Sequence, residues 1–77
     1  MDKNSYMIQI RGYIPEMKKL EFMGENTADY YFGNGYIKFN GTESELDNLL
    51  RTMSKDETYF KVIGIFDDSS FKTLKAL

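Results

Sequence analysis

The dipeptide Asn34-Gly35, between two aromatic runs, constrains the fold of this chain more than any other feature. Asn-Gly flanked by alternating apolar residues is a strong β-hairpin signal, because a type I′ turn needs a positive φ at both central residues. The two-residue turn also fixes the register, so that Tyr30 faces Phe39 across the hairpin. We therefore predict two paired strands on either side of this turn, over residues 30–33 and 36–39.

Side chains alternate between the two faces of a strand, so this register sorts the hairpin residues into two sets. One set is apolar and is predicted to face the core: Tyr30, Phe32, Ile37 and Phe39. The other set is predicted to face the opposite side of the sheet: Tyr31, Tyr36 and Lys38.

A helix is predicted directly after the hairpin, over residues 42–55. Thr42 is the expected N-cap, and Glu45 three residues later completes a capping box that satisfies two backbone donors. Apolar residues with the i, i+3, i+4, i+7 spacing of one helix face follow, namely Leu46, Leu49, Leu50 and Met53.

Residues 5–14 are predicted to form a strand with one buried face, because Ile8 and Ile10 alternate with polar residues. Residues 15–24 allow two interpretations. As a helix, they begin with Pro15 at the first helical position, end at Gly24 and place Met17, Leu20 and Met23 on one face. As a strand, they alternate at Leu20 and Phe22.

Residues 58–66 are predicted to form a strand with apolar residues on both faces. The polar run at residues 67–70 then offers several N-caps, and we expect a short final helix that carries Phe71, Leu74 and Leu77.

These elements predict one α+β domain over residues 1–77. The expected architecture is a small antiparallel sheet backed by helices, with ferredoxin-like (split βαβ) order β-α-β-β-α-β and a short C-terminal helix. If residues 15–24 form a strand, an antiparallel sheet backed by one or two helices is expected instead.

The composition argues against an enzyme. The chain has no histidine and no cysteine, so the commonest general base, thiolate nucleophiles and the usual zinc and haem ligands are missing. Asp67 and Asp68 are expected to cap a helix, since adjacent residues of an extended chain point in opposite directions and bind a cation poorly together. We expect no catalytic, metal-binding or cofactor-binding residues.

The N-terminal residues show no signal peptide, and no apolar run approaches the roughly 20 residues of a membrane span. We therefore expect a cytoplasmic protein without a membrane partner. The net charge of −2 argues against bulk electrostatic binding to duplex DNA but allows a local basic patch.

Such a patch is predicted on the sheet face opposite the helices. Alternation brings tyrosines and cations from four predicted strands to this face, and we expect its partner-binding residues to be Arg11, Tyr13, Tyr31, Tyr36, Lys38, Tyr59 and Lys61. An open alternative is that the final helix folds over this face and buries it.

The segment FGNGYIKF, residues 32–39, resembles the third-strand signature of the RNA recognition motif at Gly33, Gly35, Tyr36, Ile37 and Phe39. The resemblance implies a base-stacking position for Tyr36 and core positions for Ile37 and Phe39. The segment departs from the signature at Phe32, where a basic residue is usual, and at Asn34, where a second stacking aromatic is usual.

Two functions are therefore predicted. The first is a small non-enzymatic adaptor, regulator or inhibitor that contacts another protein through the aromatic, basic sheet face, with a homodimer through this face as one form of it. The alternative is a single-stranded nucleic-acid-binding module with an RNA-recognition-motif-like sheet platform.

Overall fold

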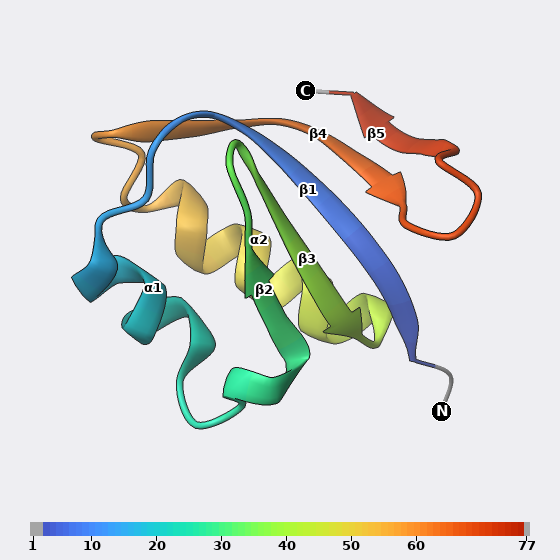
Figure 1. Cartoon of the computed structure of the whole chain (residues 1–77), viewed down its shortest axis with the longest axis horizontal. Coiled ribbons are helices and arrows are strands. Elements are labelled where there is room, and N and C mark those ends of the chain that lie inside the picture. The colour runs from blue at the N-terminus through green and yellow to red at the C-terminus, as the bar shows by residue number, and fades with distance from the viewer. Residues whose placement is uncertain (1–2, 77) are drawn as a thin grey trace.

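The computed structural model describes residues 3–76, and Figure 1 shows its strands and helices. In chain order these are β1 (Asn4–Gly12), α1 (Glu16–Met23), the 3₁₀ turn η1 (Thr27–Asp29), β2 (Tyr30–Phe32), β3 (Tyr36–Gly41), α2 (Glu43–Ser54), β4 (Phe60–Asp67) and β5 (Thr73–Ala76). The α+β class expected from the sequence is therefore confirmed.

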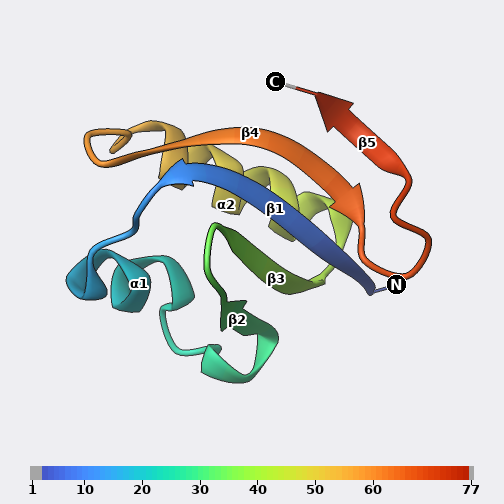
Figure 2. The same ribbon diagram turned by 45° about the horizontal axis from the view of Figure 1, so that its top comes forward.

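The strands form one five-stranded antiparallel sheet in the order β2-β3-β1-β4-β5 (Figures 1 and 2). This corrects the predicted fold, since the ferredoxin-like layout with a C-terminal helix does not describe this sheet. β1 is the central strand and pairs with β3 on one side and β4 on the other.

The C-terminal segment is the main error of the sequence-based prediction. β5 pairs with β4, opposing Lys75 to Ile65, in place of the expected helix. The polar residues after β4 make a turn: the Phe71 N–H donates to the Asp67 carbonyl at 2.8 Å, and Phe71 adopts a positive φ of 56°. This pairing of β5 with β4 supplies hydrogen-bond partners to the backbone groups along the outer edge of β4, which would otherwise be unpaired. Leu77 lies outside the described residues.

The hairpin register is confirmed: Tyr30 opposes Phe39, Tyr31 opposes Lys38 and Phe32 opposes Ile37. The turn type is not type I′, however. Gly35 has a φ of +85°, but among residues 3–76 Phe71 is the only non-glycine with a positive φ, so Asn34 lacks the conformation that a type I′ turn needs. The Gly35 carbonyl accepts a hydrogen bond from the Ile10 N–H at 2.9 Å, which fastens the turn to β1.

The prediction of α2 is confirmed in detail. The Thr42 hydroxyl accepts from the Glu45 N–H at 3.2 Å, and the Glu45 carboxylate accepts from the Thr42 N–H at 2.9 Å. These two bonds form the capping box that fixes the start of the helix. Leu46, Leu49 and Met53 are buried, as their spacing predicts.

Residues 16–23 form a helix, which decides between the two sequence interpretations, but its orientation differs from the prediction. Met17 and Leu20 are exposed, and Phe22 is the buried residue of α1, where its ring meets Phe60 edge to face at 5.8 Å. Pro15 is the N-cap residue rather than the first helical residue. A single large aromatic therefore determines which side of α1 packs inward.

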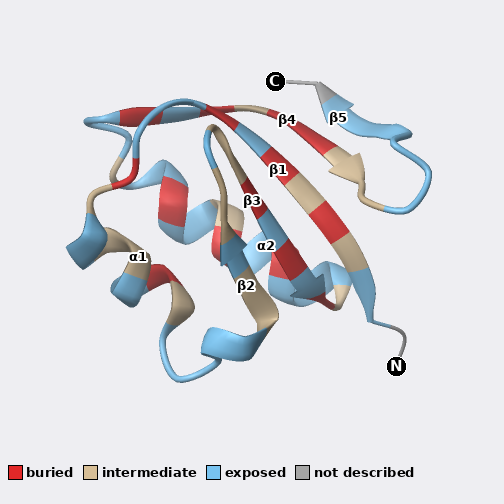
Figure 3. Cartoon of the chain, in the orientation of Figure 1, coloured by how far each residue is buried: buried red, intermediate tan, exposed pale blue. Residues whose placement is uncertain are grey.

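The hydrophobic core lies between the sheet and the two helices, on one side of the sheet only (Figures 2 and 3). Buried residues alternate along the central strands, so the other side of these strands stays accessible. The core residues are Tyr6, Ile8, Ile10, Ile14, Phe22, Ile37, Phe39, Leu46, Leu49, Met53, Phe60, Val62 and Ile65.

Candidate functional site

The side of the sheet opposite the helices, called the open face below, carries the residues singled out in the sequence. Strand alternation and cross-strand pairing place on it Met7, Gln9 and Arg11 from β1, Tyr31 from β2, Tyr36 and Lys38 from β3, and Lys61 and Phe66 from β4. Within residues 3–76, β5 extends the sheet at its edge instead of folding over this face (Figure 2).

Tyr31 and Tyr36 form an aromatic pair at the β2–β3 end of the open face. Their ring centroids are 6.2 Å apart with an interplanar angle of 35°, and 59% of the Tyr31 surface is exposed. The Tyr36 ring lies over Gly33, where a Cβ atom would come within 2.3 Å of the ring. Glycine at this position therefore allows the ring of Tyr36 to lie against the backbone beside Tyr31.

Arg11 and Lys61 are directly opposed on the neighbouring strands β1 and β4, and both are exposed. Neither takes part in a salt bridge within the described part of the chain. Like charges directly opposite each other in a sheet repel, so this pair is unfavourable until an anion lies nearby.

Tyr13 and Tyr59 extend this cationic region beyond the ends of β1 and β4. The Tyr13 N–H donates to the Tyr59 carbonyl at 3.0 Å, and the two ring centroids are 5.4 Å apart. Gly12 has a φ of +94°, and a Cβ there would lie 2.2 Å from the Tyr59 carbonyl oxygen. The close approach of the two tyrosine segments thus depends on a glycine.

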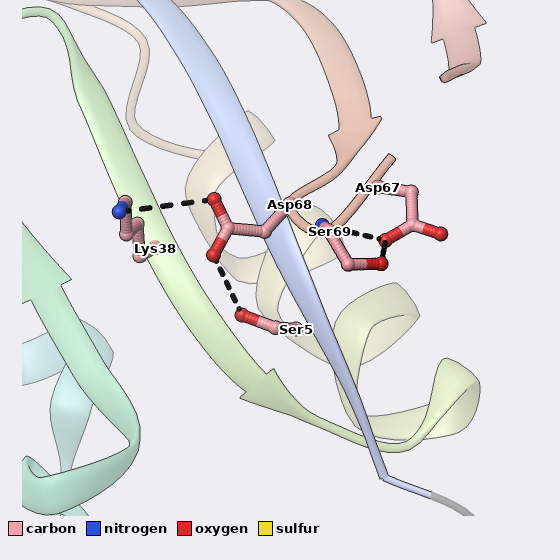
Figure 4. A network of polar contacts seen from close by, with 5 residues as sticks. All are labelled: Ser5, Lys38, Asp67, Asp68 and Ser69. Atoms are coloured by element: carbon pink, nitrogen blue, oxygen red, sulfur yellow. Dashed lines mark hydrogen bonds and ion pairs between the residues drawn. The ribbon is translucent and has the colours of Figure 1, made fainter. Parts of the chain in front are cut away.

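Lys38 has an ionic partner that the sequence did not predict. Its Nζ lies 3.8 Å from Asp68 Oδ1, and the Ser5 hydroxyl donates to Asp68 Oδ2 at 3.1 Å (Figure 4). The Asp68 N–H also donates to the Ser5 carbonyl at 3.0 Å, which holds the carboxylate at this edge of the open face. Lys38 is therefore less available to an anionic ligand than Arg11 or Lys61.

Asp67, the other acid of this pair, supports the turn into β5. Its Oδ1 accepts from the Ser69 N–H at 3.0 Å and from the Ser69 hydroxyl at 2.9 Å (Figure 4). These bonds, the backbone one foremost, hold the pKa of Asp67 below its usual range. The two acids thus have separate local partners, although neither caps a helix as predicted.

The structure separates the seven predicted site residues into two groups on one sheet. Tyr31, Tyr36 and Lys38 gather on the β2–β3 hairpin, and Arg11, Tyr13, Tyr59 and Lys61 gather where β1 ends and β4 begins.

Half-buried Met7 and Phe66 oppose each other on the open face, and Phe66 was not among the predicted site residues. Simple alternation along β4 predicts Ile63 on this face, but the register shifts between Gln9 and Ile10. Ile63 is the extra residue of this irregularity, which reverses the side on which the rest of β4 points. Gly64, next to Ile63, is the sequence signal for this bulge, because an isolated glycine within a strand often marks one.

Among residues 3–76, no cluster of three or more acidic, histidine or cysteine side chains is arranged to hold a metal ion. None of the helices in this part of the chain is long and apolar enough to cross a membrane.

Family models, curated proteins and solved structures include none that matches this chain. The similarity of residues 32–39 to the RNA recognition motif thus has no support from a family model.

Proposed function

We propose that this protein is a small non-enzymatic adaptor, regulator or inhibitor that binds another protein through the open face and acts in the cytoplasm. The observation that supports this proposal is a sheet face with exposed tyrosines and cations that no described element covers. Tyrosine, methionine and arginine are enriched at the centres of protein interfaces, and all three occur on this face.

The opposed cations favour an acidic partner. Carboxylates of a partner placed between Arg11 and Lys61 would relieve the repulsion of this pair, which is not neutralised within the described residues. Met7 and Phe66 offer apolar contact area beside these cations. The expected ligand is thus a protein surface that combines acidic and apolar side chains.

A homodimer through the open face is less well supported than a complex with a different protein. A two-fold dimer would bring Arg11 and Lys61 of both copies into one interface, which adds like-charge repulsion. A partner with the opposite charge avoids this cost.

Single-stranded nucleic acid is the second candidate ligand. It is favoured by the Tyr31–Tyr36 pair, since exposed aromatic rings near cations stack on bases. The ion pair of Lys38 with Asp68 counts against it, because the cation nearest the tyrosines is already bound to a carboxylate.

Charge reversal tests the protein-binding proposal. The double variant Arg11→Glu/Lys61→Glu should bind the partner captured from source cells about tenfold or more weakly, because it places like charges opposite the carboxylates of the partner. Arg51→Glu/Lys55→Glu is the matched control, since both residues are exposed, lie at the end of α2 and change the net charge equally. Equal losses in the two variants would contradict a site on the open face.

A titration of isotope-labelled protein with mixed-sequence single-stranded RNA and DNA separates the two candidate ligands. NMR shifts confined to the open face would favour the nucleic-acid function. So would a binding constant whose dependence on salt concentration is smaller in Lys61→Ala than in the wild type, by about one phosphate contact. The protein-binding proposal expects no such shifts at physiological salt.

A further inference from the structure

A groove lies on the opposite side of the sheet from the open face, between α2 and the strands β4 and β5. Its volume is about 510 Å³, compared with about 150 and 170 Å³ for two other hollows of the surface. It is lined by side chains of β1, α2, β4 and β5.

The groove exists because the sheet continues beyond the helices. β5 is added outside β4, and in Figure 1 neither helix lies behind it. The register shifts between Ile65 and Phe66, which leaves Leu74 as an extra residue between two paired positions of β5. Leu74 lines the groove and is 49% exposed, so an apolar side chain is available at its outer wall.

The inner part of the groove is apolar. Tyr6, Leu46 and Ile65 are core residues whose surfaces also line it, and Leu50 is half-buried on the adjacent turn of α2. Burial of an apolar side chain against this lining is favourable, because it removes apolar surface from water.

The rim of the groove is acidic. Glu43 and Asp47 lie four residues apart on α2, an arrangement in which like charges repel. Neither has an ion-pair partner within residues 3–76. With Asp67 the lining holds three carboxylates against one ammonium group, that of Lys75. The complementary ligand is therefore cationic at its edges and apolar at its centre.

We propose that this groove is a docking site for a segment of a partner protein in which an apolar side chain is flanked by lysine or arginine. The apolar side chain lies between Leu50 and Leu74, and the flanking cations lie near Glu43 and Asp47. This site is separate from the open face and takes a ligand of the opposite charge. A chain with both sites joins an acidic partner on one side of its sheet to a basic partner on the other.

The probe is a synthetic amphipathic peptide of leucine and lysine, added to isotope-labelled full chain and followed by NMR. The proposal expects shifts at residues 43–50 and 73–75, and saturable binding at physiological salt. The same peptide with glutamate in place of lysine is expected to leave these signals unmoved. Shifts confined to the open face, or equal shifts of residues 43–50 and 73–75 with both peptides, would overturn the proposal.

Two variants test the chemistry of the groove. Glu43→Gln/Asp47→Asn should weaken binding of the leucine-lysine peptide roughly fivefold, since exposed ion pairs are individually weak. Glu25→Gln/Glu57→Gln removes two exposed carboxylates outside the groove and is the matched control, expected to bind as the wild type does. Equal weakening in both variants would assign the binding to net charge and refute the site.

Leu74→Ala tests the apolar contribution without disturbing the core, because Leu74 is outside the buried cluster. Peptide binding should weaken at least threefold, and unchanged binding would contradict the assigned anchor position.

Sedimentation of the chain alone tests whether a second copy of the chain occupies the groove. If the chain forms concentration-dependent dimers and Leu74→Ala dissociates them, the occupant of the groove is a second copy of the chain. That result would overturn the proposal of a partner segment.

Discussion

The two helices of this protein differ in how they are held to the same sheet. α2 begins with a reciprocal capping box and buries Leu46, Leu49 and Met53 along one face. α1 has no side-chain hydrogen bond at its N-cap and buries Phe22 alone. The comparison shows that the cap and the apolar face of α2 follow from its own sequence. The orientation of α1 depends instead on the packing of one ring, that of Phe22, against Phe60.

Polar contacts hold α1 in this orientation from its flanks. Lys18 pairs with Glu21 at 3.0 Å within α1 and with Asp56 in the segment after α2, which joins the two helical regions. Lys19 pairs with Glu16 at 2.8 Å and lies 5.7 Å from the centre of the Phe32 ring. Exposed ion pairs contribute little to the free energy of unfolding. We therefore assign these contacts a role in the orientation of α1 and only a small one in the stability of the fold.

The largest expected effect compares two methionines, one on each helix. Met53 in α2 is 0% exposed and Met17 in α1 is 82% exposed. Met53→Ala should lower the free energy of unfolding by about 2–5 kcal/mol, because the substitution leaves a cavity in the core. Met17→Ala should change it by less than about 0.5 kcal/mol. Urea denaturation of both variants measures the contrast, and similar losses would mean that α1 also packs through its Met17 side.

A smaller effect is expected at the start of α2. Thr42→Ala removes the hydroxyl that accepts from the Glu45 N–H and should cost about 1 kcal/mol of unfolding free energy. Thr42→Ser keeps the acceptor and is the matched control, expected to retain most of the stability. If Thr42→Ala unfolds like the wild type in urea, the capping box does not specify α2 and the contrast with α1 loses its basis.

The smallest expected effect is a pH dependence of the same cap. The backbone N–H of Thr42, more than its hydroxyl, lowers the pKa of Glu45 from its ordinary value of 4.5. Because the folded pKa is lower than the unfolded one, the stabilisation is complete above pH 4.5 and is lost as the pH falls through the folded pKa.

Unfolding measured from pH 7 to pH 3 in wild type and Glu45→Gln should therefore show a difference that shrinks below pH 4.5. A constant difference across this range would show that the charge of Glu45 is not involved.

Prediction from sequence succeeded where the signals were local. The hairpin register follows from the Asn34-Gly35 turn, and the start of α2 follows from Thr42 and Glu45, because each signal acts within four residues. It failed for the final segment, where the helical spacing of Phe71 and Leu74 was outweighed by pairing with β4. The paired residues are close in the sequence, since Phe66 opposes Thr73, and the error was to interpret the polar residues 67–70 as helix caps when they form the turn of a hairpin.

The candidate site shows the same division. Tyr31, Tyr36 and Lys38 were correctly assigned to one face, since strand alternation is a local rule. The contact of Asp68 with Ser5 joins residues 63 positions apart, and the ion pair of Asp68 with Lys38 arises at the same place. The sequence therefore predicted the face on which the hairpin side chains lie, but not the pairing of Lys38 with Asp68 or the presence of Phe66 in place of Ile63.

The central position of β1 has a consequence for how the chain folds. β1 opposes Tyr6 to Asp67 and Gly12 to Phe60, so its pairing on that side joins residues from opposite ends of the sequence. Such non-local contacts slow folding, because a long loop must close before any bond forms. During synthesis, β1 can pair with the hairpin strand β3 as soon as residue 41 is free, but its other edge stays unpaired until β4 emerges. The sheet is therefore complete only when β4 reaches the second edge of β1.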